Sequence, residues 1–194
     1  MFDMTHLARP ALVAVALTLA LGAARADTRT IDVAGAISHD VEGVAANTTL
    51  SIFLAPGAHD TAIGWNVALT AYSGSWLTEM KLSLLESTGA RGVNLSPGYA
   101  DNFSGNASYS SLGNVDLVGI ANDFYLGSDG LLKLQFFEEI NDLAGADGVW
   151  NSGLVTVVYS AAAVPEPAPW LSLSAGLLAF AVWGRRRPGG LAGC

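Results

Sequence analysis

The sequence predicts an all-β protein built on a single antiparallel β-sandwich, of the jelly-roll or immunoglobulin-like type. Apolar and polar residues alternate with a period of two in several runs between residues 49 and 160, and turn-forming residues separate these runs. Between residues 27 and 163, no stretch carries apolar residues at helical spacing over three turns. Seven or eight short strands joined by turns are typical of sandwiches.

The alternation assigns the strands in chain order. The apolar faces of the first three runs consist of Leu50, Ile52 and Leu54; of Trp65, Val67, Leu69 and Ala71; and of Trp76, Met80, Leu82 and Leu84. Glu79, Lys81 and Ser83 are expected on the opposite face of the third run. Three later runs cover residues 115–120, 131–138 and 154–160.

Glycine, proline, serine and aspartate mark the turns between these runs. The turn signals are Pro56-Gly57, Ser73-Gly74, Gly89 to Gly92, Ser96-Pro97-Gly98, Ser128-Asp129-Gly130 and Asp147-Gly148. Residues 94–114 are the most polar stretch, and we predict a long loop or an irregular edge there.

The charge of the central region argues against nucleic acid as a partner. Residues 27–166 contain four basic and sixteen acidic residues, which gives a formal charge of −12. Such a surface repels nucleic acid and anionic lipid headgroups, and it suits an exported protein or a binder of cations. The single cysteine is Cys194, so the central domain has no disulfide and no cysteine metal site.

The first 26 residues have the pattern of a secretory signal helix. Arg9 supplies a positive charge, Ala11 to Leu21 is apolar, and Ala24-Arg25-Ala26 is a small-x-small cleavage site. We therefore predict cleavage by signal peptidase and a mature chain that begins at Asp27. The alternative, a permanent N-terminal anchor, fits less well because the apolar run is short.

The C-terminal region combines three elements in order. Val164-Pro165-Glu166-Pro167 is an extended tetrapeptide, because each proline fixes its own φ and restricts the residue before it. Residues 168–184 are predicted to form a short transmembrane helix. Arg185, Arg186 and Arg187 then act as a cytoplasmic stop by the positive-inside rule, which leaves residues 189–194 as a cytoplasmic tail.

Residues 164–188 resemble the PEP-CTERM sorting signal, in which a Val-Pro-Glu-Pro motif precedes a transmembrane helix and an arginine-rich end. The resemblance implies export in a Gram-negative bacterium that makes exopolysaccharide, and recognition of Val164 to Pro167 by an exosortase-type membrane protease. The extension from Pro188 to Cys194 is slightly longer than the family pattern. An ordinary membrane anchor explains the helix and the arginines, but it does not explain Pro-Glu-Pro. The organisation is thus a signal peptide (1–26), a sandwich (27–163), a sorting signal (164–188) and a tail.

Signatures of catalysis are missing from the sequence. It contains no Gly-x-Ser-x-Gly, His-Glu-x-x-His or Gly-x-Gly motif. His39 and His59 each precede an aspartate, and we expect both in solvated loops. Glu138 and Glu139 are adjacent strand residues, so their side chains should point to opposite faces and not converge on one substrate. We therefore predict no catalytic residues, and a secreted hydrolase is the least favoured function.

Calcium is the metal that suits this composition. Ca²⁺ binds carboxylate and carbonyl oxygens, which acidic loops of exported sandwiches supply. Glu139, Asp142 and Asp147 are the first candidates as ligands, and Asp123 and Asp129 flank a second loop. Neither loop has EF-hand spacing, and local turn formation is the alternative explanation for these residues.

Exposed aromatic residues raise the possibility of carbohydrate binding. Tyr99, Phe103 and Tyr109 lie in the polar stretch and are expected to form a platform, whereas Trp65 and Trp76 are assigned to the core. The other aromatic candidates are Tyr72, Phe124, Tyr125, Trp150 and Tyr159.

The sequence therefore predicts an exported, non-catalytic protein of the cell surface or extracellular matrix, anchored in the membrane until its tail is processed. No cofactor is required, with calcium as the exception under the alternative function. That alternative is a calcium-assisted module that binds exopolysaccharide.

Overall fold

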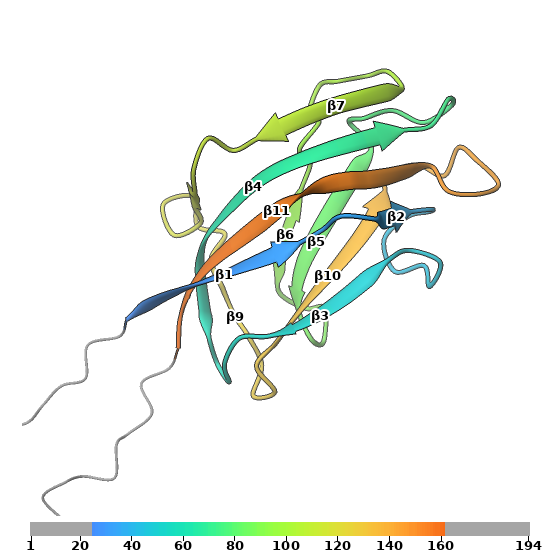
Figure 1. Ribbon diagram of the computed structural model, residues 1–194. Helices are drawn as coiled ribbons and strands as arrows, with labels where there is room; N and C mark the ends of the chain where they lie inside the picture. The colour runs from blue at the N-terminus through green and yellow to red at the C-terminus, as the bar shows by residue number, and fades with distance from the viewer. Residues whose placement is uncertain (1–24, 162–194) are drawn as a thin grey trace, which may run out of the picture.

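The computed structural model describes residues 25–161, which form two antiparallel sheets packed face to face (Figure 1). All regular structure in this part of the chain is β. The strands are β1 (Ala26–Asp32), β2 (Ala36–Ser38), β3 (Thr49–Phe53), β4 (His59–Ala71), β5 (Met80–Glu86), β6 (Gly92–Leu95), β7 (Gly105–Ser110), β8 (Val115–Asp116), β9 (Phe124–Tyr125), β10 (Leu131–Glu138) and β11 (Gly148–Ser160). The prediction of an all-β, antiparallel, two-sheet domain is confirmed.

The two sheets differ in size and in their central strands. Sheet A has the order β1-β11-β4-β7, with β2 added to β11 and with β8 and β9 added to β4. Sheet B has the order β3-β10-β5-β6. Consecutive strands β4 and β5 belong to different sheets, and so do β10 and β11. The chain crosses between the layers at the loops that follow β4 and β10, and also after β2, β3, β6 and β9.

Alternating burial follows the alternation of the sequence. In β3, Leu50 and Ile52 are half-buried while their neighbours are exposed, and in β4 the side chains of Val67, Leu69 and Ala71 are buried. One face of each sheet must be apolar to pack on the other, so the period-two pattern identifies the inner face.

The core between the sheets is centred on two aromatic rings. Trp150 of β11 and Phe136 of β10 are fully buried, and their ring centroids lie 5.1 Å apart in an edge-to-face arrangement. Leucines of β5 and β10 surround this pair, including Leu82, Leu84 and Leu134. Trp150 therefore belongs to the core and is excluded from any sugar-binding surface.

Several sequence predictions need correction. Trp76 lies in the loop before β5 and is 46% exposed, whereas Glu79 of the same loop is buried. The alternation between residues 76 and 80 therefore does not continue the strand, because tight turns occupy that segment. In the predicted strand 115–120, β8 covers Val115–Asp116 and the remainder turns away, which leaves Ile120 exposed.

The polar stretch 94–114 contains more structure than its composition indicates. The last residues of β6 fall in it, and β7 forms the edge of sheet A beside β4. Strands β1 and β2 were not anticipated either. An edge strand with one solvated side needs little apolar sequence, so alternation is weak there.

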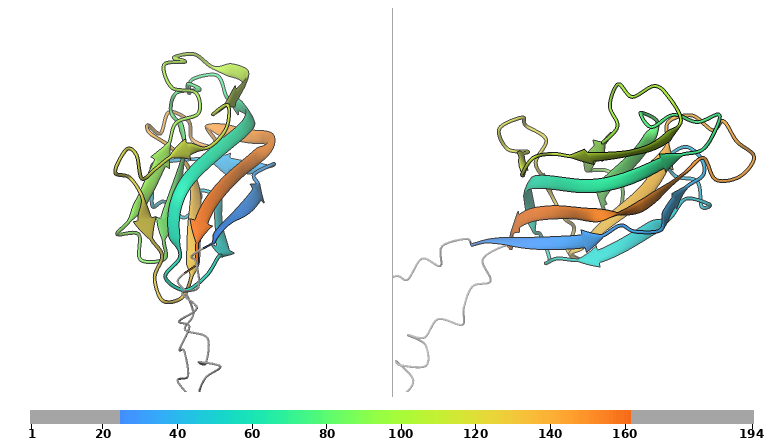
Figure 2. Two further views of the ribbon diagram at one scale, coloured as in Figure 1. Left: turned by 90° about the vertical axis from the view of Figure 1, so that its left-hand side faces the viewer. Right: turned by 45° about the horizontal axis from the view of Figure 1, so that its top comes forward.

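The two ends of the sandwich have different roles. Ala26 of β1 pairs with Ser160 of β11, so both ends of the described chain leave the sandwich together (Figure 2). We call this the terminal end. The opposite end carries the loops 39–48, 72–79, 96–104 and 139–147, and we call it the loop end (Figures 1 and 2).

Several predicted segments lie outside the described residues. These are the signal helix and Ala24, the motif Val164 to Pro167, the helix 168–184, the arginines 185–187 and the tail 189–194. Within residues 25–161, no helix has the length and apolar character that membrane crossing requires.

Replacing Gly153 by alanine should destabilise the protein by about 1–3 kcal/mol. Gly153 follows an irregularity in the β11–β4 register, has φ +130°, and a Cβ there would lie 2.3 Å from the carbonyl oxygen of Asn66. Gly145→Ala is the control, because a Cβ at Gly145 meets nothing within 4 Å. Urea denaturation measures both; equal stability of the two variants would contradict the expectation.

Candidate functional site

Three buried carboxylates gather at the loop end of the sandwich. Glu138 ends β10, Asp147 immediately precedes β11, and Glu79 immediately precedes β5. Glu138 and Asp147 are fully buried and Glu79 is 5% exposed. Because charged groups are almost never buried without partners, this cluster is the most unusual chemical feature of the domain.

Backbone hydrogen bonds between separate loops hold the cluster together. The amide of Glu138 donates to the carbonyl of Asp40 at 3.0 Å, and the amide of Glu139 donates to the carbonyl of Glu79 at 3.0 Å. The amide of Asp147 donates to the carbonyl of Ser38 at 3.0 Å. Three loops and the end of β2 are thus fixed to one another around the carboxylates.

The hydroxyl groups of two buried serines contact the carboxylate of Glu138. The hydroxyl of Ser38 donates a short hydrogen bond to one carboxylate oxygen, and the hydroxyl of Ser75 lies 3.5 Å from the other. Burial raises the pKa of Glu138 to about 8. The hydrogen bond from Ser38 lowers this pKa, whereas the nearby carboxylates of Asp147 and Glu79 raise it. At neutral pH Glu138 therefore holds its proton in the folded protein.

The other two carboxylates organise turns. Asp147 accepts hydrogen bonds from the amides of Asp142 at 3.3 Å and Leu143 at 3.1 Å, and Glu79 accepts one from the amide of Trp76 at 3.0 Å. Burial raises the pKa of Glu79 and of Asp147. Both side chains therefore have a structural role in the loops that connect the two sheets.

The three predicted calcium ligands, Glu139, Asp142 and Asp147, lie in the same region of the structure, but each has a different environment. Glu139 forms an ion pair with Lys81 at 2.6 Å, and Asp142 is exposed, whereas Asp147 is buried beneath the turn. Within residues 25–161, no three His, Cys, Asp or Glu side chains converge as metal ligands. The oxygens of Glu139 and Asp147 are occupied by protein donors, so these residues do not fit a preformed calcium site, and calcium binding here stays a prediction.

A shallow pocket of about 560 Å³ lies beside the cluster. His39, Asp40 and Asp142 supply its charged and titratable lining, and loop residues 143–145 close one side. Its acidic character suits a cation or a polar ligand better than an apolar one.

Exposed aromatic side chains surround the same end. Trp76 is 46% exposed, Phe103 is 62% exposed and Tyr99 is 85% exposed. The amide of Leu77 donates to the carbonyl of Phe103 at 3.1 Å, so the loops that carry Trp76 and Phe103 run side by side. Tyr109 differs from the prediction, since its ring is half-buried and its hydroxyl donates to Asp101 at 2.5 Å.

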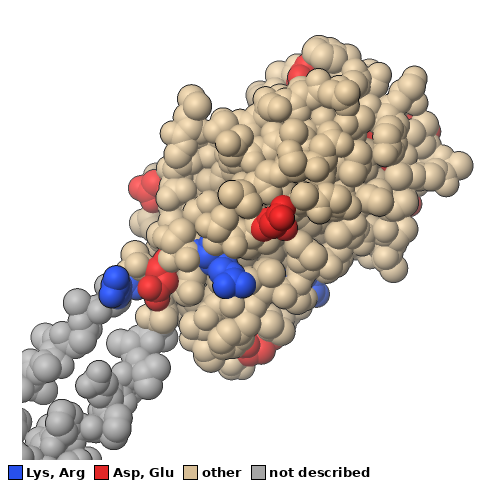
Figure 3. All heavy atoms as spheres, viewed as in Figure 1, with Lys and Arg blue, Asp and Glu red and all other residues tan. Residues whose placement is uncertain are grey.

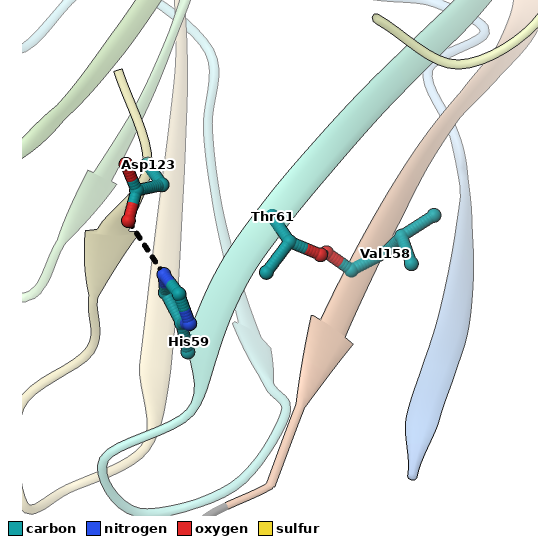
Figure 4. Close-up of polar contacts among 4 residues, drawn as sticks. All are labelled: His59, Thr61, Asp123 and Val158. Atoms are coloured by element: carbon teal, nitrogen blue, oxygen red, sulfur yellow. Dashed lines mark hydrogen bonds and ion pairs between the residues drawn. The ribbon is translucent and has the colours of Figure 1, made fainter. Parts of the chain in front are cut away.

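The two histidines lie in different settings. His59 begins β4 instead of lying in a loop, and its Nε2 lies 2.7 Å from Asp123 Oδ2 (Figure 4). Its ring stacks on Tyr125 with centroids 4.1 Å apart. The hydroxyl of Thr61 points away from His59 and donates to the carbonyl of Val158 at 3.2 Å (Figure 4). Among residues 25–161, Asp123 is the hydrogen-bond partner of the His59 ring and no serine or threonine hydroxyl contacts it, so the pair lacks the nucleophile of a catalytic triad in this part of the chain.

Asp60 follows His59 and points into the interior. It is fully buried, and no described residue donates a hydrogen bond to either carboxylate oxygen. Burial raises the pKa of Asp60 to about 7. Asp60 pairs with Phe124 of β9 on one side and with Tyr159 of β11 on the other, which places it at the terminal end, away from Glu138.

Sequence reasoning missed the central members of the cluster. Ser38, Ser75 and Glu79 belong to no catalytic or metal-binding motif, and no local pattern in the sequence predicts that they lie beside Glu138. The expected divergence of Glu138 and Glu139 is confirmed, because one is buried and the other is exposed. An available signal was the position of Glu138 on the apolar face of β10, in register with Leu132, Leu134 and Phe136.

Comparisons with known proteins add little to this description. No protein-family model matches the chain, and no curated protein is similar to it. Among solved structures, the cyanophage Pam1 capsid shares 13% identity with a TM-score of 0.39, covering 78% of this chain and 94% of that one. The infectious bursal disease virus VP2 subviral particle shares 16% identity with a TM-score of 0.36, covering 70% of this chain and 32% of that one. Similarities this low carry no argument about function.

Replacing Glu138 by glutamine should remove a pH dependence of stability. Because the folded state holds the proton up to about pH 8 and the unfolded carboxyl releases it near 4.5, stability contributed by this group is lost as pH rises through that window. We expect wild type to lose on the order of a few kcal/mol of unfolding free energy across it, and Glu138→Gln to lose markedly less.

Urea denaturation from pH 4.5 to 8 measures this effect. Glu139→Gln is the matched control, since Glu139 is exposed and should leave the pH profile of wild type intact. Identical profiles for wild type and Glu138→Gln would exclude Glu138 as the titrating group.

Proposed function

We propose that the chain is an exported, non-catalytic protein of the cell surface or extracellular matrix. Signal peptidase releases it at Asp27, the C-terminal helix holds it in the membrane, and an exosortase-type protease recognises Val164 to Pro167. In this proposal the sandwich is of the jelly-roll or immunoglobulin-like type, flanked by a signal helix and a transmembrane helix.

One observation carries this proposal. All of β1 pairs with the C-terminal part of β11, from Ala26 with Ser160 to Asp32 with Leu154. The chain therefore leaves the sandwich at the terminal end, while the carboxylate cluster and exposed aromatic rings lie at the loop end. A domain tethered by its C-terminus would present these loops away from the membrane. Cleavage before Asp27 would leave six residues of β1 in the sheet, from Asp27 to Asp32.

The separation of the loop end from the terminal end also supports a module that contacts something outside the cell. Loops at one end of a sandwich are the usual place for recognition, because the sheets hold them rigidly while their sequences vary. Here loop-to-loop backbone hydrogen bonds supply that rigidity.

The mass of the native protein tests processing at both ends. We expect the envelope or medium fraction to contain a chain that begins at Asp27 and ends near Pro165 to Pro167. Replacing Pro165, Glu166 and Pro167 together by alanine should abolish C-terminal processing, because the extended peptide is lost. Pro188→Ala is the control outside the motif and should be processed normally. If the wild-type chain retains Arg187 in every fraction, the tail is not processed and acts only as a membrane anchor, which would contradict the sorting-signal proposal.

A second candidate function is carbohydrate binding assisted by calcium, and the exposed rings of Trp76 and Phe103 favour it. Aromatic faces bind sugars through their apolar surface, and these two rings lie on neighbouring loops. Asp142 is exposed and lines the acidic pocket, and its carboxyl lies against that of Glu79.

Glycan-array binding with and without EDTA tests this candidate. Each of Trp76→Ala and Phe103→Ala should weaken binding by about fivefold, since an aromatic anchor contributes roughly 1 kcal/mol or more. Phe53→Ala, which truncates an exposed ring of β3, is the control. If glycan binding persists in EDTA and in Asp142→Asn, calcium is not required for it. If no glycan binds, the carbohydrate-binding candidate is wrong.

A further inference from the structure

A groove of about 800 Å³ crosses the outer face of sheet B, separate from the loop-end cluster. Its volume falls within the range typical of ligand sites. Its floor comes from β3, β10, β5 and β6, and its lining includes Thr49, Gln135, Asn94, Lys133 and Arg91. Four neighbouring strands span about 14 Å, which suits an oligosaccharide better than a single sugar.

One row of the groove is polar and uncharged. Gln135 pairs with Thr49 on one side and with Ser83 on the other, and Ser83 pairs with Asn94. The row crosses all four strands, but Ser83 is fully buried, so the groove is lined by the hydroxyl of Thr49 and the amides of Gln135 and Asn94. Such groups bind sugar hydroxyls as both donors and acceptors.

A second row of the groove is cationic. Lys133 pairs with Leu85, and Leu85 pairs with Gly92, which follows Arg91 in the β5–β6 turn. Because Lys133 and Gln135 are two residues apart on β10, the cationic row lies about 7 Å from the amide row. The spacing allows one ligand to contact both rows.

The cations of this groove are concentrated compared with the rest of the domain. Residues 27–163 contain four basic residues, and Lys81, Arg91 and Lys133 all belong to sheet B or its turn. The outer face of sheet A, turned toward the viewer in Figure 3, is mostly uncharged, and its few basic side chains lie mainly toward the terminal end. The ion pairs within residues 25–161 involve neither Arg91 nor Lys133, although Lys133 donates to the carbonyl of Ser87 at 3.2 Å.

The loop 39–48 forms a wall over the amide row. The amide of Gly43 donates to Gln135 Oε1 at 2.6 Å, and Asn94 Nδ2 lies 3.4 Å from Glu42 Oε2. Gln135 is therefore held in one orientation. Glu42 places a negative charge at the amide side of the groove, while both cations lie at the other side.

We propose that this groove binds an anionic polysaccharide whose sugars carry carboxylates, with Arg91 and Lys133 contacting the carboxylate and Gln135 and Asn94 contacting the hydroxyls. A neutral glycan would not use the cationic row. The formal charge of −12 over residues 27–166 opposes every polyanion, so binding here depends on the two local cations. A nucleic acid is disfavoured relative to a sugar acid because its phosphates do not require the hydrogen-bonding amides of Gln135 and Asn94. This inference rests on the carbohydrate-binding candidate for its ligand class, but it assigns the binding to sheet B and not to the exposed rings of Trp76 and Phe103 at the loop end.

Isothermal titration of the purified full chain in detergent tests the proposal, with oligogalacturonate as the probe. Methyl-esterified oligogalacturonate is the matched ligand, because it keeps the sugar and removes the charge. We expect wild type to bind the free acid at least about tenfold more tightly than the ester. The double variant Arg91→Gln/Lys133→Gln should lose about tenfold or more of the affinity for the acid and little of the affinity for the ester.

Lys81→Gln is the control variant, since Lys81 lies on the same sheet but is paired with Glu139. It should bind like wild type, and thermal unfolding should confirm that all variants are folded. Unchanged binding by the double variant, failure of wild type to bind the acid, or equal binding of a single-stranded oligonucleotide would overturn the proposal. If saccharide binding persists in the double variant but is lost in Trp76→Ala, the carbohydrate function stands and the groove assignment fails.

Discussion

The contact between the two central strands, β10 and β11, is the constraint on which the rest of the structure depends. Phe136 and Trp150 meet across the interface between the sheets, and each strand is bordered by a neighbour on both sides. Burial of these two rings fixes the separation and relative orientation of the sheets. It also fixes where β10 ends and β11 begins, and therefore where Glu138 and Asp147 lie. The carboxylate cluster is thus a consequence of core packing at its edge.

The same arrangement separates two surfaces with different chemistry. The loop end is acidic, with exposed aromatic rings and carboxylates that stabilise turns. The outer face of sheet B is polar and holds most of the domain's few cations. The acidic loops are remote from the terminal end. The groove on sheet B extends toward the terminal end, because Lys133 lies near the start of β10 and Arg91 lies in the turn that follows β5.

Buried acids link the loops to pH. Burial raises the pKa of Glu138 and of Asp60, so both hold protons at pH values where exposed carboxyls are charged. At the loop end, loss of the proton from Glu138 would place charge beside Asp147 and Glu79 among loops joined by backbone hydrogen bonds. Repulsion among the three carboxylates would therefore destabilise the loops that connect the two sheets.

The sequence by itself determined the fold class and the strands with strong alternation, and the two signals that it predicts at the ends of the chain stay predictions. Alternation in β3, β4 and β10 reports a sheet with one buried face, which is a local property of the chain. The tertiary structure alone decided that Trp150 is core while Trp76 is exposed, that β7 forms an edge in a polar stretch, and that Ser38, Ser75, Glu79, Glu138 and Asp147 meet. It also decided the rows of the groove, which come from four strands far apart in the chain. Such juxtapositions depend on strand register and sheet order, and no local pattern of residues encodes either.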